Sequence, residues 1–178
     1  GGAYFKFCEG SFTDCIFRNN SAANGGAMYF KDSSGDFLIS NSQLEFNAAI
    51  LSGGSIFNKE TNLIIQDCSF SGNMANQGGA LFSYGGGNAT ISNSLFSNNG
   101  ASITGGAAEV RSSSVVSFVQ CTFDANIADI DCDGKGGGAV LEVAGSTVTL
   151  NNPTICANLV CDVEGDFSGI QPVIIGEI

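Results

Sequence analysis

Residues 17–30 read FRNNSAANGGAMYF, and variants of this phrase recur along the chain. FSGNMANQGGALF begins at Phe70, FSNNGASITGGAAEV at Phe96 and FDANIADIDCDGKGGGAVLEV at Phe123. Two degenerate copies are FNAA, which begins at Phe46, and ICAN, which begins at Ile155. An aromatic residue, an asparagine and a glycine pair therefore recur in phase, which is the mark of a repeat architecture.

The repeat has the spacing of a coiled β-structure. Successive Gly-Gly pairs begin 24 to 32 residues apart, and apolar residues precede most of the aromatic positions at intervals of two, the period of a half-buried strand. Stacking equivalent residues of successive repeats would form continuous ladders inside a coil. The pattern predicts an all-β fold, a single-stranded right-handed parallel β-helix (solenoid) of about six coils of 24–32 residues, with three short strands per coil. A β-sandwich would not explain why the two motifs recur in step.

Each motif has a physical role in such a coil. We expect the aromatic side chains in the core and the glycine pairs at turns that exclude side chains. We expect the asparagines at corners, where they tolerate left-handed dihedrals and can form hydrogen bonds to the backbone or to their own copies in neighbouring coils. The expected ladders are Phe17, Phe46, Phe70, Phe96 and Phe123; Asn20, Asn73, Asn99, Asn126 and Asn158; and Gly25, Gly26, Gly53, Gly54, Gly78, Gly79, Gly105, Gly106, Gly137 and Gly138.

We expect one β-helix domain over residues 1–178, with an inserted acidic loop at 127–136 and a last partial coil or cap at 159–178. The chain opens in mid-phrase on GGAYF, which suggests a segment of a longer chain. Its open coil ends would then stack on further repeats or on other chains.

Charge and cysteine content limit the partners and the compartment. Six Lys and Arg residues stand against seventeen Asp and Glu, a net charge of −11 that disfavours nucleic acid and anionic lipid. The sequence contains no apolar run long enough to span a bilayer. Seven cysteines favour an oxidising compartment, so we expect a secreted or cell-surface protein.

Catalytic machinery is sparse. The sequence has no His, which removes the most frequent general base and zinc ligand. The six basic residues are scattered, and Arg111, in the strand after a glycine pair, is expected on a solvated face. We therefore expect a protein that is not an enzyme. The alternative is a carbohydrate-active β-helix, similar to polysaccharide lyases or epimerases, or a carbohydrate-binding one.

The inserted loop carries the one candidate metal site. Asp129, Asp131 and Asp133 form an Asp-x-Asp-x-Asp-Gly pattern whose carboxylates can converge on Ca²⁺. The twelfth position of that loop is Val140, which offers no carboxylate. The competing interpretation is an acidic solvated loop, and no other cofactor is expected.

The cysteines fall into two groups. Cys15, Cys68 and Cys121 share one ladder position in alternate coils, too far apart for a disulfide, so we expect reduced, packed thiols. Cys132 and Cys161 follow aromatic positions in adjacent coils and can bridge to hold the inserted loop. Cys156 with Cys161 and Cys8 with Cys15 are rival pairs.

The paired Gly-Gly-Ala and Phe-x-x-Asn motifs resemble the repeats of the chlamydial polymorphic membrane proteins. The matching residues are Gly25–Ala27, Gly78–Ala80, Gly105–Ala107 and Gly137–Ala139, with Phe17–Asn20, Phe70–Asn73, Phe96–Asn99 and Phe123–Asn126. Similar repeats occur in surface proteins of microbial eukaryotes. The resemblance implies an autotransporter-passenger-like adhesin, a structural module that presents a repetitive surface to a protein or glycan partner. A self-assembling filament or scaffold subunit is a further alternative.

Overall fold

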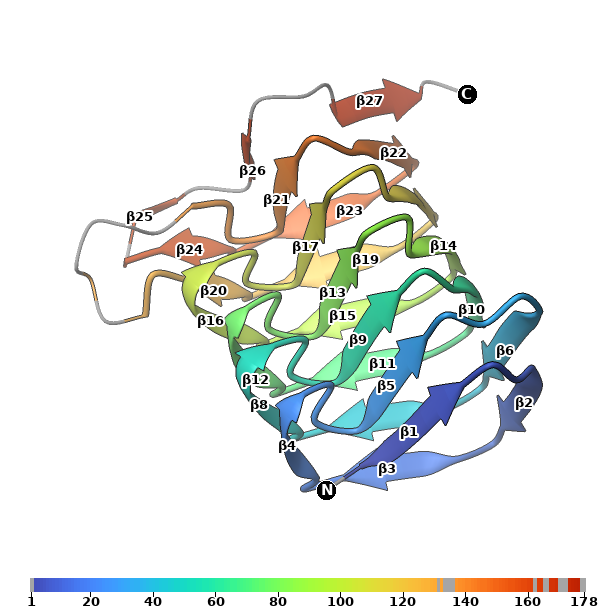
Figure 1. Cartoon of the computed structure of the whole chain (residues 1–178). Helices are drawn as coiled ribbons and strands as arrows, with labels where there is room; N and C mark the ends of the chain where they lie inside the picture. The colour runs from blue at the N-terminus through green and yellow to red at the C-terminus, as the bar shows by residue number, and fades with distance from the viewer. Residues whose placement is uncertain are drawn as a thin grey trace.

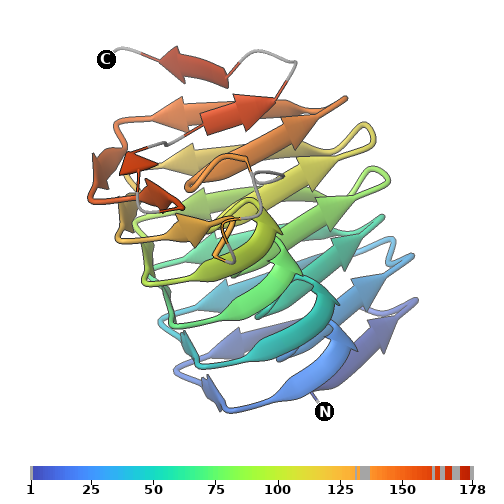
Figure 2. The ribbon, with the colours of Figure 1, turned by 90° about the vertical axis from the view of Figure 1, so that its left-hand side faces the viewer.

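The computed structural model of the chain is an all-β solenoid whose backbone winds through successive coils of four strands (Figure 1). The structure describes residues 2–130, 132, 137–161, 163, 164, 167–169 and 173–176. Within these residues, six sets of four strands, β1–β4 to β21–β24, follow one another, and Figure 2 shows them stacked from the N-terminal to the C-terminal coil.

Equivalent strands of successive coils form four sheets, numbered here by the first strand of each. Sheet 1 contains β1 (Ala3–Lys6), β5 (Met28–Lys31), β9 (Ile56–Lys59), β13 (Leu81–Tyr84), β17 (Ala108–Arg111), β21 (Leu141–Ala144) and β26 (Phe167–Gly169). Sheet 2 contains β2 (Gly10–Thr13), β6 (Asp36–Ser40), β10 (Asn62–Gln66), β14 (Asn88–Ser92), β18 (Val115–Val119), β22 (Thr147–Asn151) and β27 (Val173–Gly176).

Sheets 3 and 4 complete the coil. Sheet 3 contains β3 (Ile16–Arg18), β7 (Gln43–Glu45), β11 (Ser69–Ser71), β15 (Leu95–Ser97), β19 (Thr122–Asp124) and β23 (Thr154–Cys156). Sheet 4 contains β4 (Ser21–Asn24), β8 (Ala48–Ser52), β12 (Met74–Gln77), β16 (Gly100–Thr104), β20 (Ile127–Ala128), β24 (Leu159–Val160) and β25 (Val163–Glu164). Among the described strands every pairing is parallel except that of β24 with β25.

Each coil has four strands rather than the three expected. The segment before each aromatic position, expected as one strand, divides at a corner residue with left-handed backbone dihedrals. In the second coil this residue is Asn41, with φ 47°, which separates β6 from β7. Asp14, Asp67, Asn93, Gln120 and Asn152 have positive φ at the equivalent positions.

The core is built from side-chain columns that run through the coils. One column is Phe17, Leu44, Phe70, Phe96, Phe123 and Ile155, in register along sheet 3. Its central rings are parallel, with centroids 4.6 Å apart for Phe70 and Phe96 and 5.2 Å for Phe96 and Phe123. Phe70, Phe96 and Phe123 are fully buried, so this column anchors the hydrophobic core.

The prediction that Phe46 belongs to this column is wrong. Phe46 is 60% exposed and has φ 52°, whereas Leu44 takes the core position and Asn47 takes the asparagine position. The second repeat is therefore Leu-x-x-Asn and has kept its asparagine. The aromatic residue misleads the alignment because it stands at the left-handed corner, two residues beyond the core position.

The asparagines form a continuous ladder of Asn20, Asn47, Asn73, Asn99, Asn126 and Asn158, which is buried from Asn47 onward. The Oδ1 of each asparagine after the first accepts hydrogen bonds from the backbone amide and the Nδ2 of its neighbour in the preceding coil, at 2.9 to 3.1 Å. From Asn47 onward, each Nδ2 also donates to the carbonyl of the core-column residue one coil back, as Asn99 does to Phe70 at 3.0 Å. The left-handed corner residue is the one before each asparagine, not the asparagine itself.

The two glycines of each pair have different functions. The first has positive φ, for example 62° at Gly78, whereas the second is held against the backbone of the next coil. A Cβ on Gly79 would lie 2.2 Å from the carbonyl oxygen of Gly106. In the last of these turns the predicted pair Gly137–Gly138 is displaced by one residue, because Gly138 takes the first position and Ala139 the second. Gly137 instead bridges to Thr104.

Small polar and sulfur side chains alternate at the corner before sheet 3, in the order Cys15, Ser42, Cys68, Ser94 and Cys121. The Ser94 hydroxyl accepts a hydrogen bond from the Cys68 amide at 3.1 Å, and the Ser42 hydroxyl accepts one from the Cys15 amide at 3.1 Å. Cys68 and Cys121 are free and buried, as expected, and burial raises the pKa of both thiols. They are therefore neutral packing groups.

The asparagine ladder yields a matched pair of variants. Asn99→Asp removes two donated hydrogen bonds and places a carboxylate against the Oδ1 of Asn126, so we expect it to lower the free energy of unfolding by about 3 kcal/mol or more. Asn98→Asp alters the exposed left-handed neighbour and should change stability by less than about 0.5 kcal/mol. Urea denaturation measures both, and equal effects of the two variants would contradict the ladder.

Candidate ligand-binding surface

The outer face of sheet 1 brings together aromatic and basic side chains that are far apart in the sequence. Strand register places Tyr4, Tyr29, Phe57, Phe82 and Glu109 in one outward column. Two residues further along the strands, the register forms a second column of Lys6, Lys31, Lys59, Tyr84 and Arg111. Four of the six basic residues of the chain therefore lie in one line, at the inter-strand spacing of about 4.8 Å or twice that.

The aromatic column is a continuous series of ring contacts. Tyr4 and Tyr29 meet edge to face at 5.2 Å between centroids, as do Tyr29 and Phe57 at 4.7 Å. Phe57 and Phe82 are stacked at 5.2 Å. Tyr4 is 56% exposed, whereas Phe57 and Phe82 are buried, so the column offers an accessible aromatic surface at its N-terminal end. Burial raises the pKa of the Tyr29 phenol, which is therefore a neutral hydrogen-bonding group.

The basic column is partly neutralised by acidic residues at the following turn. Asp32 lies 4.0 Å from the Lys6 ammonium and 3.9 Å from that of Lys31, and Glu60 lies 3.5 Å from that of Lys59. Glu60 raises the pKa of Lys59, which keeps this ammonium charged. These lysine side chains keep between 28% and 38% of their surface exposed. They are available to donate hydrogen bonds to a ligand.

The aromatic column lies beside the glycine corner that joins sheet 4 to sheet 1. A cavity of about 260 Å³ opens there, between the rings of Tyr4 and Tyr29 and the small residues Ala22, Ala23 and Asn24. Gly2, Ala3 and Gly25 complete its lining. Aromatic rings and small side chains thus form a shallow hollow at the N-terminal end of this corner.

In the fifth coil a buried acidic residue replaces the aromatic side chain of the column. Glu109 occupies the column position of the aromatic residues and is fully buried. Its Oε2 accepts a hydrogen bond from the Thr104 hydroxyl at 2.5 Å, and its Oε1 forms an ion pair with the Arg111 guanidinium. Arg111 is therefore a half-buried, paired structural group, which differs from the solvated arginine expected from the sequence.

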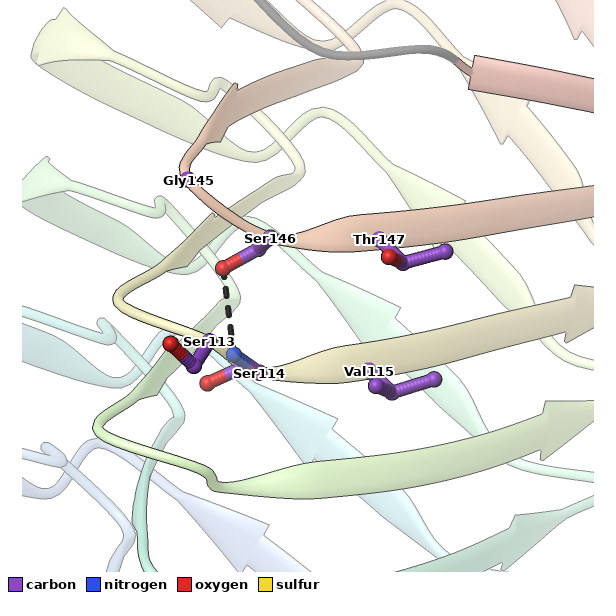
Figure 3. A pocket seen from close by; sticks show the side chains of 6 residues that line it. All are labelled: Ser113, Ser114, Val115, Gly145, Ser146 and Thr147. Carbon is purple, nitrogen blue, oxygen red and sulfur yellow. Dashed lines mark hydrogen bonds between the residues drawn. The ribbon is translucent and has the colours of Figure 1, made fainter.

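Two other clefts lack titratable groups suited to catalysis. Figure 3 shows one of about 470 Å³ at the corner between sheets 1 and 2, lined by Ser113, Ser114, Val115, Gly145, Ser146 and Thr147. There the Ser114 amide donates to the Ser146 hydroxyl at 3.1 Å. The other, of about 520 Å³, lies on the outer face of sheet 2, where Asp36 is the only titratable residue of its lining. Neither pairs a nucleophile with a base.

The predicted calcium ligands are mostly outside the described residues. Asp131 and Asp133 lie there, and the described residues contain no group of three His, Cys, Asp or Glu able to hold a metal ion. Asp129 is described: it is nearly fully buried, has φ 53°, and its backbone carbonyl accepts a hydrogen bond from the Cys132 amide at 2.9 Å. The calcium site stays a prediction.

The structure places a disulfide between Cys132 and Cys161, whose Cα atoms are 4.9 Å apart and which are separated by 29 positions in the sequence. Of the rival partners, Cys8 is an exposed free thiol and Cys15 a half-buried one, whereas the exposed Cys156 thiol lies 3.3 Å from the Oδ1 of Asp124. The disulfide joins the acidic loop to the end of β24. Sheet 4 has only two-residue strands in these coils, β20 and β24, so a covalent link replaces hydrogen bonds that longer strands would make.

Sequence reasoning missed the basic column although a signal for it exists. Lys31, Lys59 and Arg111 each stand six residues after the first glycine of a pair, and Tyr84 stands six after Gly78. A comparison of repeats by distance from the glycines would have aligned them. Alignment on the aromatic residues hides the pattern, because the number of residues between aromatic and glycine varies.

The sequence matches the family model described as a right handed beta helix region, over residues 1–155. The chain belongs to this family. The match confirms the predicted handedness and agrees with the parallel coils and their register. Searches of curated proteins and of solved structures found no match. The more specific resemblance to the chlamydial repeats therefore stays a prediction.

Removal of the disulfide between Cys132 and Cys161 should destabilise the protein, whereas removal of a free thiol should not. Cys132→Ser should lower the free energy of unfolding by up to about 3 to 4 kcal/mol, because the bridge closes a long loop. Cys8→Ser, which alters an exposed free thiol, should leave the melting temperature unchanged. Thermal melts of both variants, with and without reductant, measure this. A wild-type melt unaffected by reductant would contradict the bridge.

Proposed function

We propose that this chain is an extracellular or cell-surface β-helical binding module that holds an extended glycan on the outer face of sheet 1. One observation carries the proposal: register aligns an aromatic column with a basic column on a chain that is otherwise acidic. A ligand with its own linear repeat matches such a surface better than a compact molecule does, because aromatic and basic side chains recur together in the first three coils.

The two columns suit different parts of a sugar. The apolar faces of sugar rings can pack on Tyr4 and Tyr29, whose rings border the cavity at the glycine corner. Lys31 and Lys59 can donate hydrogen bonds to hydroxyl or carboxylate groups two residues further along the strands. This geometry favours a glycan that lies along the long axis of the solenoid, perpendicular to the strands.

Charge limits the kind of glycan. Around the surface, four basic residues stand beside Asp32, Glu60 and Glu109, and Glu142 is in register with Glu109 on the next strand, so the surface has no excess of positive charge. The chain as a whole carries −11 and repels polyanions. Neutral or sparsely acidic glycans therefore fit better than heavily sulfated ones.

Binding is favoured over catalysis. Arg111, the basic residue considered for a lyase-type reaction, is paired with the buried Glu109 carboxylate. A paired guanidinium is a poor proton acceptor. An adhesive role towards a protein partner and a lyase or epimerase activity are the alternative functions, and binding and cleavage assays distinguish them.

A glycan array with the whole chain, followed by calorimetry on the best ligand, tests the proposal. Tyr29→Ala should weaken binding by about tenfold or more, and Lys31→Ala by a smaller factor. Ser92→Ala, on the outer face of sheet 2, is the matched control and should leave affinity unchanged. If no glycan on the array is bound, or if neither sheet 1 variant changes the affinity, the proposal is contradicted. Release of unsaturated sugars would favour the lyase alternative.

We propose separately that the acidic loop binds calcium, on the basis of its Asp-x-Asp-x-Asp pattern. Millimolar Ca²⁺ should raise the melting temperature of the wild type, because a ligand that binds only the folded state stabilises it. Asp133→Asn should abolish the shift. No shift at millimolar Ca²⁺ would reject the site.

A further inference from the structure

The outer face of sheet 4 is uncharged and apolar. None of its parallel strands, from β4 to β24, contains an acidic or basic residue, although the chain has seventeen acidic residues. Large apolar side chains are instead exposed on it: Ile50 at 68%, Leu51 and Met74 at 51%, and Ile103 at 38%. Exposed apolar groups gathered on one face are typical of an interaction surface.

Neighbouring contacts make this patch continuous. The side chain of Ile130, itself 41% exposed, covers Gly100, since a Cβ there would lie 2.6 Å from its Cδ1 and 3.9 Å from the Cε of Met74. At the corner between sheets 3 and 4, the exposed ring of Phe46 covers Gly72 in the same way. Apolar side chains thus extend from the second coil to the fifth.

The face is also ridged. β8 and β16 have five residues, whereas β4 and β12 have four, and the register shifts at each pairing between them. The extra residue is a bulge, which pushes Ile50 and Leu51 outward in the second coil and Ile103 outward in the fourth. Bulged and unbulged coils therefore alternate along the rod.

We infer that the outer face of sheet 4 binds a second copy of this chain. A twofold axis that lies in the interface, parallel to the strands and between β8 and β12, places the second coil of each copy over the third coil of the other. It also places the fourth coil over the first. The ridges of β8 and β16 then fit against the unbulged β12 and β4 of the partner, a self-complementary interface.

Electrostatics favours a second copy at this face. Two chains of net charge −11 repel each other, and they approach with least opposition where their surfaces carry no charge. Sheet 1 presents charged columns and sheet 3 presents Arg18, Glu45 and Asp124, so a contact between two copies at either face would remove water from charged side chains. Sheet 2 is nearly uncharged, but its outer residues are mostly polar.

The area of the face indicates a weak dimer. Only the first four coils of each copy overlap in this arrangement. At about 4.8 Å per coil, and with strands of four or five residues at about 3.3 Å, they give a flat area of roughly 300 Å² per copy. This is less than half of what standard interfaces bury per partner. An interface of that size is weak and transient, so association should appear only at high micromolar protein concentrations.

Sedimentation equilibrium of the whole chain, from about 10 to 500 µM, tests the inference without any glycan. The wild type should approach twice the monomer mass. Ile50→Asp should weaken association more than about tenfold, because it buries a charge in the interface. Val115→Asp alters an apolar residue on sheet 2 that is 52% exposed and should have no effect. Leu51→Asn is a second, milder variant, and circular dichroism verifies that each variant folds.

The salt dependence gives an independent readout. Raising NaCl from about 50 to 500 mM should strengthen the dimer, because salt screens repulsion between the acidic chains while the interface itself contains no ion pair. A monomeric wild type across the range would overturn the inference. So would a dimer that Val115→Asp disrupts as much as Ile50→Asp, or one that weakens with salt.

Discussion

The hydrogen bond between successive asparagine side chains is the interaction on which this structure depends. At the corner between sheets 3 and 4 the backbone turns through a left-handed residue, so the next amide has no strand partner. The Oδ1 of the asparagine one coil on accepts from that amide and from the asparagine side chain beside it. The asparagine side chain donates two hydrogen bonds from Nδ2 and accepts two at Oδ1 without carrying a charge. An ionised aspartate has no donor and a serine has only one, so neither can repeat the pattern.

The ladder has consequences on both faces of the coil. Because it fixes which residue of one coil lies above which residue of the next, it stacks Phe70 on Phe96 in the core and the glycine pairs at their turns. The same register aligns side chains outside, where no packing demand requires it. The aromatic and basic columns of sheet 1 and the uncharged face of sheet 4 are therefore surface features that exist only because the coils are in phase. This is why we place function on faces rather than in a cleft.

Much of the fold could be predicted from the sequence because each motif suits one kind of corner or core position. Phenylalanine, asparagine and paired glycine that recur in phase fit few folds besides a β-helix, and the family match agrees. The errors arise where one residue type can occupy two environments. Phe46 fits the core pattern although it stands at a corner, and Gly137 fits a turn that in fact begins at Gly138. The fourth strand is not evident because Asn41 and its equivalents can continue a strand as well as end one.

The surface sites were harder to predict. Lys31 and Lys59 are ordinary exposed lysines in the sequence, and only the register brings them together. The bulges of β8 and β16 depend on a single extra residue in strands that differ in composition, which no local pattern reveals. Spacing alone, by contrast, suggests the pairing of Cys132 with Cys161, because both follow the aromatic position of adjacent coils.

Hydrogen exchange at the corner amides tests the asparagine ladder most directly. The backbone amides of Asn47, Asn73 and Asn99 lie at turns, yet each donates to a buried side-chain oxygen. Resolved by nuclear magnetic resonance, they should exchange as slowly as the amides of the adjoining strands β11 and β15. Exchange at the rate of exposed turn amides would show that the corners are open to water, and would contradict the role of the asparagines in keeping the coils in register.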